Sequence, residues 1–216
     1  MRLHEYNENL LQRRPELTDC YMAIDEKSSW NKKYSESSHS SLEPDPFLVS
    51  AYEEFVADRP AGSALDVAGG VGRHAIWLAQ RGWRTRLIDI SDVGIGLAEK
   101  NASRALGPVA KEFLITSEVA DLDSVQDFGR EQYDLVLVFF FLQRELFPAL
   151  AAALKPGGHL IYKTYTTEQK NFAGGPSHPM FLLEPNELLH AFSSLRILHY
   201  HETVQEKGVA ELVARK

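Results

Sequence analysis

Short apolar runs and amphipathic stretches follow one another along most of this chain. The apolar runs end at a polar residue or a glycine turn, and a helix-forming stretch usually comes next. This repeated strand–helix order predicts a parallel sheet with helices on both faces. We expect strands at residues 64–67, 84–90, 113–119, 133–139 and 159–165, and helices at residues 47–57, 73–80, 92–105, 144–154 and 185–192.

Two further patterns refine this architecture. The run at residues 133–139 is so apolar that both of its faces must be covered, as in a central parallel strand. Residues 195–204 and 209–214 flank a short polar turn and predict a closing antiparallel hairpin. The expected class is therefore α/β, with a doubly wound, Rossmann-like sheet that is mostly parallel and ends in an antiparallel C-terminal hairpin strand.

The first 45 residues differ from the rest in composition. They are polar, and a serine-rich stretch at residues 35–41 is typical of a flexible loop or lid. Trp30 and Tyr34 lie four positions apart, within reach of each other on a helix. We expect an N-terminal polar segment and lid over residues 1–45 and a separate folded domain over residues 46–216.

Composition narrows the function classes. The chain has 216 residues, of which 44% are hydrophobic and 25% charged, as in ordinary globular proteins. A net charge of −7 disfavours unspecific nucleic-acid binding. The single cysteine, Cys20, allows no disulfide within the chain, and the longest apolar run, residues 135–142, is too short to cross a bilayer. We expect a cytoplasmic protein with no membrane or nucleic-acid partner.

The most informative stretch is residues 63–82, where an apolar run ends at Asp66 and a glycine turn opens an amphipathic helix. Strand, tight turn and helix in succession present backbone to a bound nucleotide. Counting glycines does not exclude a dinucleotide. However, a carboxylate beside the turn is unfavourable next to a pyrophosphate, whereas it suits the ammonium of a phosphate-free, cationic nucleoside such as S-adenosylmethionine.

Two more acids follow later strands. Asp89 is placed to accept both ribose hydroxyls, Asp121 to accept from the adenine amino group, and the Leu122 amide to donate to a ring nitrogen. Taken singly, these acids are equally typical of helix caps and turns. The expected cofactor-binding residues are Asp66, Ala68, Gly69, Gly70, Gly72, Arg73, Asp89, Ile90, Asp121, Leu122 and Phe139.

These segments resemble the motifs of class I S-adenosylmethionine-dependent methyltransferases. The similar segments are LDVAGGVGR (65–73), LIDIS (87–91), ADLD (120–123), YDLVLVFFFLQR (133–144) and LKPGGHLIYKTYT (154–166). The resemblance covers about residues 45–216 and implies a seven-stranded sheet with an antiparallel last strand, methyltransferase activity, and S-adenosylmethionine as the cofactor. WNKKY, PDPFL and GPSHPMFLLEPNELL resemble the tellurite-resistance type of small-molecule methyltransferase.

The chain departs from that pattern at two positions. Ala68 stands where the first glycine is usual, and its methyl group crowds the cofactor unless its φ is negative. Gln143 replaces the acid or histidine common after the fourth strand. The signatures of nucleic-acid base methylation are absent, so we expect a small-molecule acceptor such as a thiol or an oxyanion.

The expected acceptor pocket lies above the first and fourth strands. Catalytic candidates are His178 as a base, Arg144 as a holder of an anionic acceptor, and Tyr165. The alternative for His178 is a turn-capping loop histidine, and for Arg144 solvation or pairing with Glu145. No metal is assigned, since two histidines on one strand face do not make a site.

The sequence is compatible with two other functions. A nicotinamide-dependent oxidoreductase would use the same strand, turn and helix. A non-catalytic nucleotide-binding protein would keep the fold without turnover, and the departures at Ala68 and Gln143 are compatible with it.

Overall fold

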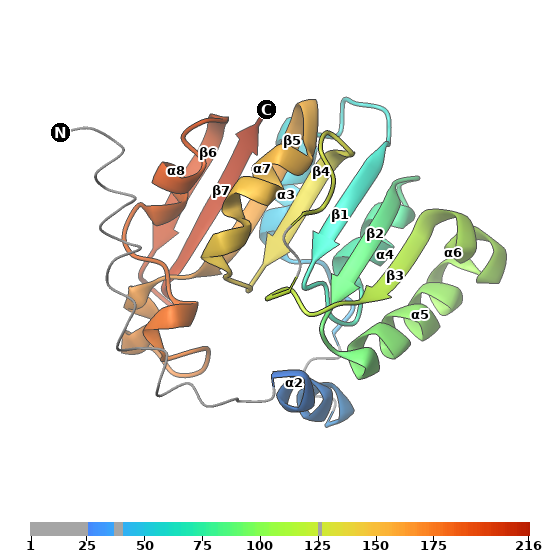
Figure 1. The fold of residues 1–216 in the computed structure, drawn as a ribbon, viewed down its shortest axis with the longest axis horizontal. Helices are drawn as coiled ribbons and strands as arrows, with labels where there is room; N and C mark the ends of the chain where they lie inside the picture. The colour runs from blue at the N-terminus through green and yellow to red at the C-terminus, as the bar shows by residue number, and fades with distance from the viewer. Residues whose placement is uncertain (1–25, 37–40, 125–126) are drawn as a thin grey trace.

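The computed structural model describes residues 26–36, 41–124 and 127–216. Their centre is a seven-stranded sheet in the order β3-β2-β1-β4-β5-β7-β6 (Figure 1). The strands are β1 (Ser63–Val67), β2 (Arg84–Asp89), β3 (Ile115–Val119), β4 (Tyr133–Phe139), β5 (Leu154–Tyr165), β6 (Arg196–Thr203) and β7 (Val209–Arg215).

The pairing confirms the expected α/β class. β1 pairs in parallel with both β2 and β4, and β4 pairs in parallel with β5. β7 runs antiparallel between β5 and β6, which makes the closing hairpin. The strand order reverses between β1 and β4, and such a switch point at the carboxyl ends of the strands is where open α/β sheets bind ligands.

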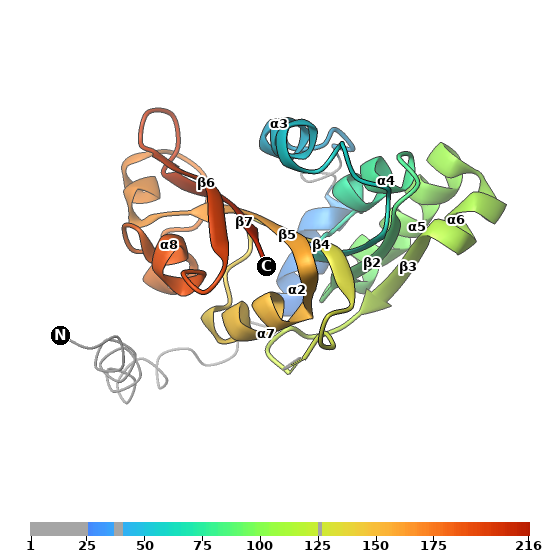
Figure 2. The same cartoon turned by 90° about the horizontal axis from the view of Figure 1, so that it is seen from above.

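Helices cover both faces of the sheet (Figure 2). β4 shows why: Val136 and Val138 pack into one core cluster, while Leu135 and Leu137 pack into another on the opposite face. The α-helices are α2 (Glu26–Ser35), α3 (Pro46–Phe55), α4 (Arg73–Ala79), α5 (Asp92–Leu106), α6 (Pro108–Leu114), α7 (Phe147–Ala153) and α8 (Glu187–Ala191), and the 3-10 helices are η1 (Arg144–Leu146), η2 (Thr167–Asn171) and η3 (Pro179–Phe181).

Three expected elements need correction. The strand expected at 113–119 begins only at Ile115, because Gly107 and Pro108 start the unforeseen helix α6, which carries Phe113. The helix expected at 144–154 is η1 followed by α7. β5 begins at Leu154 rather than at residue 159, and its pairing with β4 contains a register irregularity.

The N-terminal segment is described only in part. The expected lid contributes α2 and the approach to α3, whereas Cys20 and most of the serine-rich stretch lie outside the described residues. Trp30 and Tyr34 stack on α2 with ring centroids 5.7 Å apart, as their spacing predicts. Among the described helices, none is long and apolar enough to cross a membrane.

Candidate functional site

The glycine turn after β1 is a run of left-handed backbone at the switch point. φ is +54° at Ala68, +57° at Gly70 and +80° at Gly72, which precedes α4. Ala68 therefore lies in the left-handed region. Its φ is not negative, which was the condition for its methyl group not to crowd the cofactor. A Cβ costs energy there, so this turn carries local strain at the place where a ligand is expected.

Asp66 lies beneath this turn. Its side chain is 1% exposed, and Oδ2 accepts a hydrogen bond of 3.1 Å from the backbone N–H of Ala75. Oδ1 is buried and has no hydrogen-bond partner. Burial raises the pKa of Asp66 to about 7, and the nearby Asp89 carboxylate adds to this rise. The absence of a side chain at Gly69 permits this arrangement, since a Cβ there would lie 2.7 Å from Asp66 Oδ2.

Asp89, at the end of β2, ties the next loop to the same turn. Oδ2 accepts from the N–H of Gly70 and Oδ1 from the N–H of Ser91, both at 2.8 Å. Burial raises the pKa of this carboxyl, while the hydrogen bonds from Ser91, Gly70 and Ile90 oppose the rise. The carboxylate thus orients the backbone around the turn and lies beside Asp66 at the carboxyl edge of the sheet.

The loop after β3 brings the third acid to this edge. Asp121 is exposed, and its Oδ1 accepts from the N–H of Asp123 at 2.9 Å. The Leu122 side chain is buried in the core. Its backbone N–H donates to no acceptor within the described ranges, which leaves that donor for a ligand. Burial raises the pKa of Asp123, and the Asp121 carboxylate adds to the effect.

Helix α2 lies across this edge of the sheet and packs on α5 (Figure 1). Asn31 is its anchor: Oδ1 accepts from Ser91 Oγ at 2.5 Å, and Nδ2 donates to Asp92 Oδ1 at 2.9 Å. Lys27 adds an ion pair to Asp92 at 3.2 Å. The loop at the start of α5 is therefore held by side chains of the N-terminal segment.

The two ends of α2 face the two ends of the site. Near its start, burial raises the pKa of Glu26, and the charges of Asp123 and Asp121 add to the rise. Near its end, Tyr34 is buried with its hydroxyl against Gly70. The Tyr34 ring lies over Gly94, where a Cβ would come within 2.9 Å of Tyr34 Cε2. The helix thus spans the row of carboxylates from the loop after β3 to the glycine turn.

Arg73 is a cation beside the glycine turn. It opens α4 directly after the glycine turn and is half-buried. Its charge lowers the pKa of Asp66, Tyr34 and Tyr165 against the larger effect of burial. The described residues offer Arg73 no carboxylate at ion-pair distance. Its guanidinium is therefore open to an anionic group of a ligand.

Aromatic side chains line the carboxyl ends of β4 and β5. Phe140 has a left-handed φ of +56°, and its ring lies 5.1 Å from that of Tyr165. Beneath them, Lys163 Nζ pairs with Asp45 Oδ1 at 3.0 Å and with Glu211 Oε1 at 2.9 Å. Two carboxylates neutralise this lysine, so it supports the wall and adds little positive charge.

Arg144 is already engaged by the protein. Nε and Nη2 form a bidentate pair with Glu187 at 2.5 and 2.9 Å, and the guanidinium also donates to the carbonyls of Met180 and Leu182. The carboxylate that pairs with Arg144 is Glu187, whereas the alternative to an acceptor-holding role had named Glu145. These bonds engage the guanidinium and fasten the 180–187 segment to the start of η1.

His178 caps the start of η3, and its expected role as a base stays a prediction. The imidazole is exposed, and Nδ1 accepts from the N–H of Met180 at 3.3 Å at the start of η3. Phe139, the last of the expected cofactor residues, ends β4 at the same edge of the sheet. Its ring is buried against His74, with centroids 4.3 Å apart, in the core cluster below α3 and α4.

Sequence reasoning missed two features of this site. Asn31 lies within the WNKKY stretch, and its polar side chain on the Tyr34 helix was the available signal. His74 is buried, and its Nε2 accepts from the N–H of Asp45 at 3.3 Å. Burial lowers the pKa of His74, so the ring is neutral and holds the chain between the N-terminal segment and α3. No local pattern marks that long-range contact.

Comparison with known proteins agrees with this geometry. Residues 64–158, from β1 to the start of β5, match the family model described as "Methyltransferase domain". A comparison with curated protein sequences gave no match.

Solved structures show the same fold at low sequence identity. TehB from Haemophilus influenzae is 16% identical with a TM-score of 0.66, over 86% of this chain and 67% of that one. The magnesium protoporphyrin IX methyltransferase ChlM from Synechocystis PCC 6803, solved with bound SAH, is 20% identical with a TM-score of 0.60, over 78% and 81%. A structure described under the conversion of a disulfide bond into a thioacetal group during echinomycin biosynthesis is 19% identical with a TM-score of 0.60, over 81% and 82%.

Proposed function

We propose that this protein transfers a methyl group from S-adenosylmethionine to a small soft or anionic acceptor, such as a thiol or an oxyanion. Residues 64–158 match the model of a methyltransferase domain. The domain match favours this activity over a nicotinamide-dependent oxidoreductase, the alternative that the glycine turn left open. The single observation that carries the proposal is the buried Oδ1 of Asp66, an acceptor without a donor at the floor of the turn.

The residues at this edge fit that cofactor. A buried carboxylate with an unused acceptor is suited to an ammonium group, and it repels a pyrophosphate. Asp89 lies next along the edge, where its carboxylate suits ribose hydroxyls. Asp121 and the Leu122 N–H complete a donor and acceptor pair for an adenine ring. The half-buried Arg73 is placed to meet the methionyl carboxylate.

The protein contributes to the reaction by positioning the two reactants and by excluding water. S-adenosylmethionine, when bound, supplies a methyl carbon already activated by the sulfonium. In this proposal the glycine turn and Asp89 hold the cofactor side, while Phe140 and Tyr165 form the wall on the acceptor side. Tyr34 and α2 cover the turn and exclude water. Orientation and desolvation of this kind account for most of the acceleration in such a displacement.

The acceptor class follows from what the site lacks. Burial raises the pKa of Tyr165, so its phenol stays protonated, and His178 has a capping role. Among the residues that the structure describes, no base is evident at this edge, which favours an acceptor that arrives as an anion or as a readily ionised thiol. We assign Tyr165 to the acceptor wall and Arg144 to positioning of the 180–187 segment. The likeness in fold to the structure described under the conversion of a disulfide bond into a thioacetal group is in line with a sulfur acceptor.

A radiolabel assay tests the function. Purified protein is incubated with methyl-labelled S-adenosylmethionine and, separately, with small thiols, tellurite, selenite, phenols and amines. The proposal expects labelled product with thiols or chalcogen oxyanions, and more slowly or not at all with amines. Label transferred only to amines would contradict the acceptor class. No transfer to any acceptor by a protein that binds the cofactor would support the non-catalytic alternative.

A further inference from the structure

Phe140 has a strained backbone at the boundary between the core and the acceptor side. Its φ of +56° lies in the left-handed region, where a bulky side chain is a rare outlier. The preceding Phe139 is buried in a core cluster, whereas the Phe140 ring is partly buried and lies 5.1 Å from the ring of Tyr165. Such strain persists only where the surrounding structure holds it, and it is concentrated at functional sites.

Lys163 of β5 supplies the groups that hold this turn. The N–H of Phe140 donates to the Lys163 carbonyl at 2.7 Å, and Lys163 Nζ lies 5.8 Å from the centre of the Phe140 ring. An ammonium at this distance is attracted to an aromatic ring. Burial raises the pKa of Tyr165, and the charge of Lys163 opposes that rise, so the ammonium is near the phenol as well. The place of the Lys163 side chain therefore bears on both rings of the acceptor wall.

Asp45 fixes the Lys163 ammonium and is itself tied to the cofactor side. The residue is 6% exposed, and its Oδ1 accepts from Lys163 Nζ at 3.0 Å and from the N–H of Phe47 at 2.9 Å, which caps α3. Its backbone N–H donates to Nε2 of His74, in the first turn of α4, at 3.3 Å. Because α4 begins directly after the glycine turn, one residue joins the acceptor wall, the start of α3 and the helix that follows the cofactor turn.

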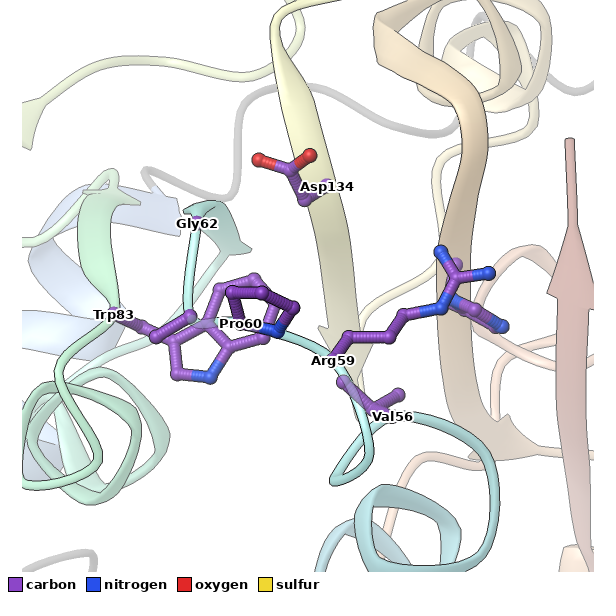
Figure 3. A pocket seen from close by; sticks show the side chains of 8 residues that line it. Val56, Arg59, Pro60, Gly62, Trp83 and Asp134 are labelled. Carbon is purple, nitrogen blue, oxygen red and sulfur yellow. The ribbon is translucent and has the colours of Figure 1, made fainter.

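Two other contacts in this region lie farther from the site. Glu211 of β7 pairs with the same ammonium at 2.9 Å, from the far side of β5 in the sheet order. Beyond the other end of α3, Arg59 Nη1 donates to the carbonyl of Gly157 in β5 at 2.6 Å. Figure 3 shows this arginine extending from the loop after α3 toward β5, at the amino edge of the sheet. These contacts share the lysine or the strand with Asp45, and they serve as matched controls.

We propose that Asp45 is a positioning residue for methyl transfer, which sets the acceptor wall at a fixed place relative to the bound cofactor through its bonds to Lys163 and His74. This inference rests on the proposed function. An in-line displacement needs the acceptor and the methyl carbon on one axis, and a misplacement of about 1 Å costs up to about a hundredfold in rate. Asp45 is buried behind the wall, so its loss lowers kcat and leaves the affinity for the cofactor unchanged.

Asp45→Ser tests the link, because serine still caps α3 but is too short to hold the ammonium as well. In the assay with labelled S-adenosylmethionine we expect kcat to fall at least about tenfold. The Kd for S-adenosylhomocysteine, measured by calorimetry, should not change. Lys163→Met cuts the same link from β5 and should lower kcat by a similar factor, so the test does not depend on the folding of one variant.

The controls are Glu211→Ser, which removes the other carboxylate from the same lysine, and Arg59→Gln, which removes the other bond between the α3 region and β5. Both should keep the parental kcat. The proposal is overturned if Asp45→Ser keeps the parental kcat, if either control loses as much as Asp45→Ser, or if the loss appears in the Kd for S-adenosylhomocysteine instead of in kcat.

Hydrogen exchange of the Phe140 amide, followed by NMR, needs no turnover and separates this proposal from the proposed function. We expect several-fold faster exchange in Asp45→Ser and the parental rate in Glu211→Ser. That result in a protein that transfers no methyl group would support the link while the proposed function fails. Parental exchange at Phe140 in Asp45→Ser would overturn the link, whatever the activity of the protein.

Discussion

The carboxylate of Asp89 accepts a hydrogen bond from the backbone N–H of Gly70, 2.8 Å away across two neighbouring loops. This bond joins the end of β2 to the glycine turn after β1. A second bond, from the N–H of Ser91, uses the other carboxylate oxygen. One side chain therefore sets the shape of the turn and also presents negative charge to the ligand edge.

Asp89→Asn tests that double role. The amide keeps one acceptor but cannot serve both N–H groups as a charged partner, and it loses the attraction for ribose hydroxyls. We expect affinity for S-adenosylmethionine to fall by about 1–3 kcal/mol, measured by calorimetry. Glu99→Gln, an exposed change on α5, is the control and should have no effect. An unchanged dissociation constant in folded Asp89→Asn would remove this residue from the site.

Ala68→Gly tests the strain in the turn. At a φ of +54° the Cβ of Ala68 is unfavourable, and removing it relieves more energy than the added freedom of the unfolded chain costs. We expect the free energy of unfolding in urea to rise by about 0.5–1 kcal/mol. The matched change Ala105→Gly, in the last turn of helix α5, should lower it by a similar amount. A loss of stability in Ala68→Gly would show that this backbone is not strained.

Local patterns predicted the carboxyl edge well, and the reason is physical. An apolar run that ends at a polar residue fits few structures other than a strand. Asp66, Asp89 and Asp121 accordingly lie at successive strand ends, as expected. The helix α6 was missed because the apolar residues before Ile115 suit a strand, while Pro108 after a glycine starts a helix.

Long-range contacts could not be predicted from the sequence. The bidentate pair between Arg144 and Glu187 joins residues 43 positions apart, and Asn31 meets Ser91 across 60 positions. Neither partner has a local pattern that names the other. The contact between the rings of Phe139 and His74, 65 positions apart, is likewise invisible to local patterns.

The pair between Arg144 and Glu187 gives a prediction on the acceptor segment. Arg144→Gln leaves Glu187 partly buried without its cation and frees the carbonyls of Met180 and Leu182. We expect KM for the acceptor to rise several-fold, with little change in cofactor affinity. In a double-mutant cycle with Glu187→Gln, the coupling on stability should be about 1–3 kcal/mol. Additive effects of the two changes would contradict the positioning role.

Helix α2 gives a prediction on the protection of this helix from proteolysis. If α2 covers the bound cofactor, S-adenosylhomocysteine should slow tryptic cleavage after Lys32 and Lys33. Asn31→Ala removes the anchor to Ser91 and Asp92, so cleavage should become several-fold faster and the ligand should protect less. Ser35→Ala, at the exposed end of the helix, is the control. Cleavage that is indifferent to both ligand and Asn31→Ala would show that α2 does not close over the site.

The pKa of Asp66 gives a prediction on pH. Because the folded protein holds this proton up to about pH 7, whereas the unfolded chain releases it near the ordinary value of 3.8, the ligand-free protein loses stability as pH rises through this window. Asp66→Asn should abolish that loss, so its stability relative to the parent protein should grow from pH 5 to about pH 8 in urea unfolding. A stability difference that stays constant with pH would mean that Asp66 titrates normally.

The most direct measurement of the central claim is a calorimetric titration of S-adenosylmethionine and of NAD into the parent protein and Asp66→Asn at about pH 8, where the Asp66 carboxyl is ionised. We predict one site for S-adenosylmethionine, no measurable binding of NAD, and a cofactor affinity at least about tenfold weaker in Asp66→Asn. Tight binding of NAD, or equal affinity of both proteins for S-adenosylmethionine, would contradict the assignment of this row of carboxylates to a cationic, phosphate-free nucleoside.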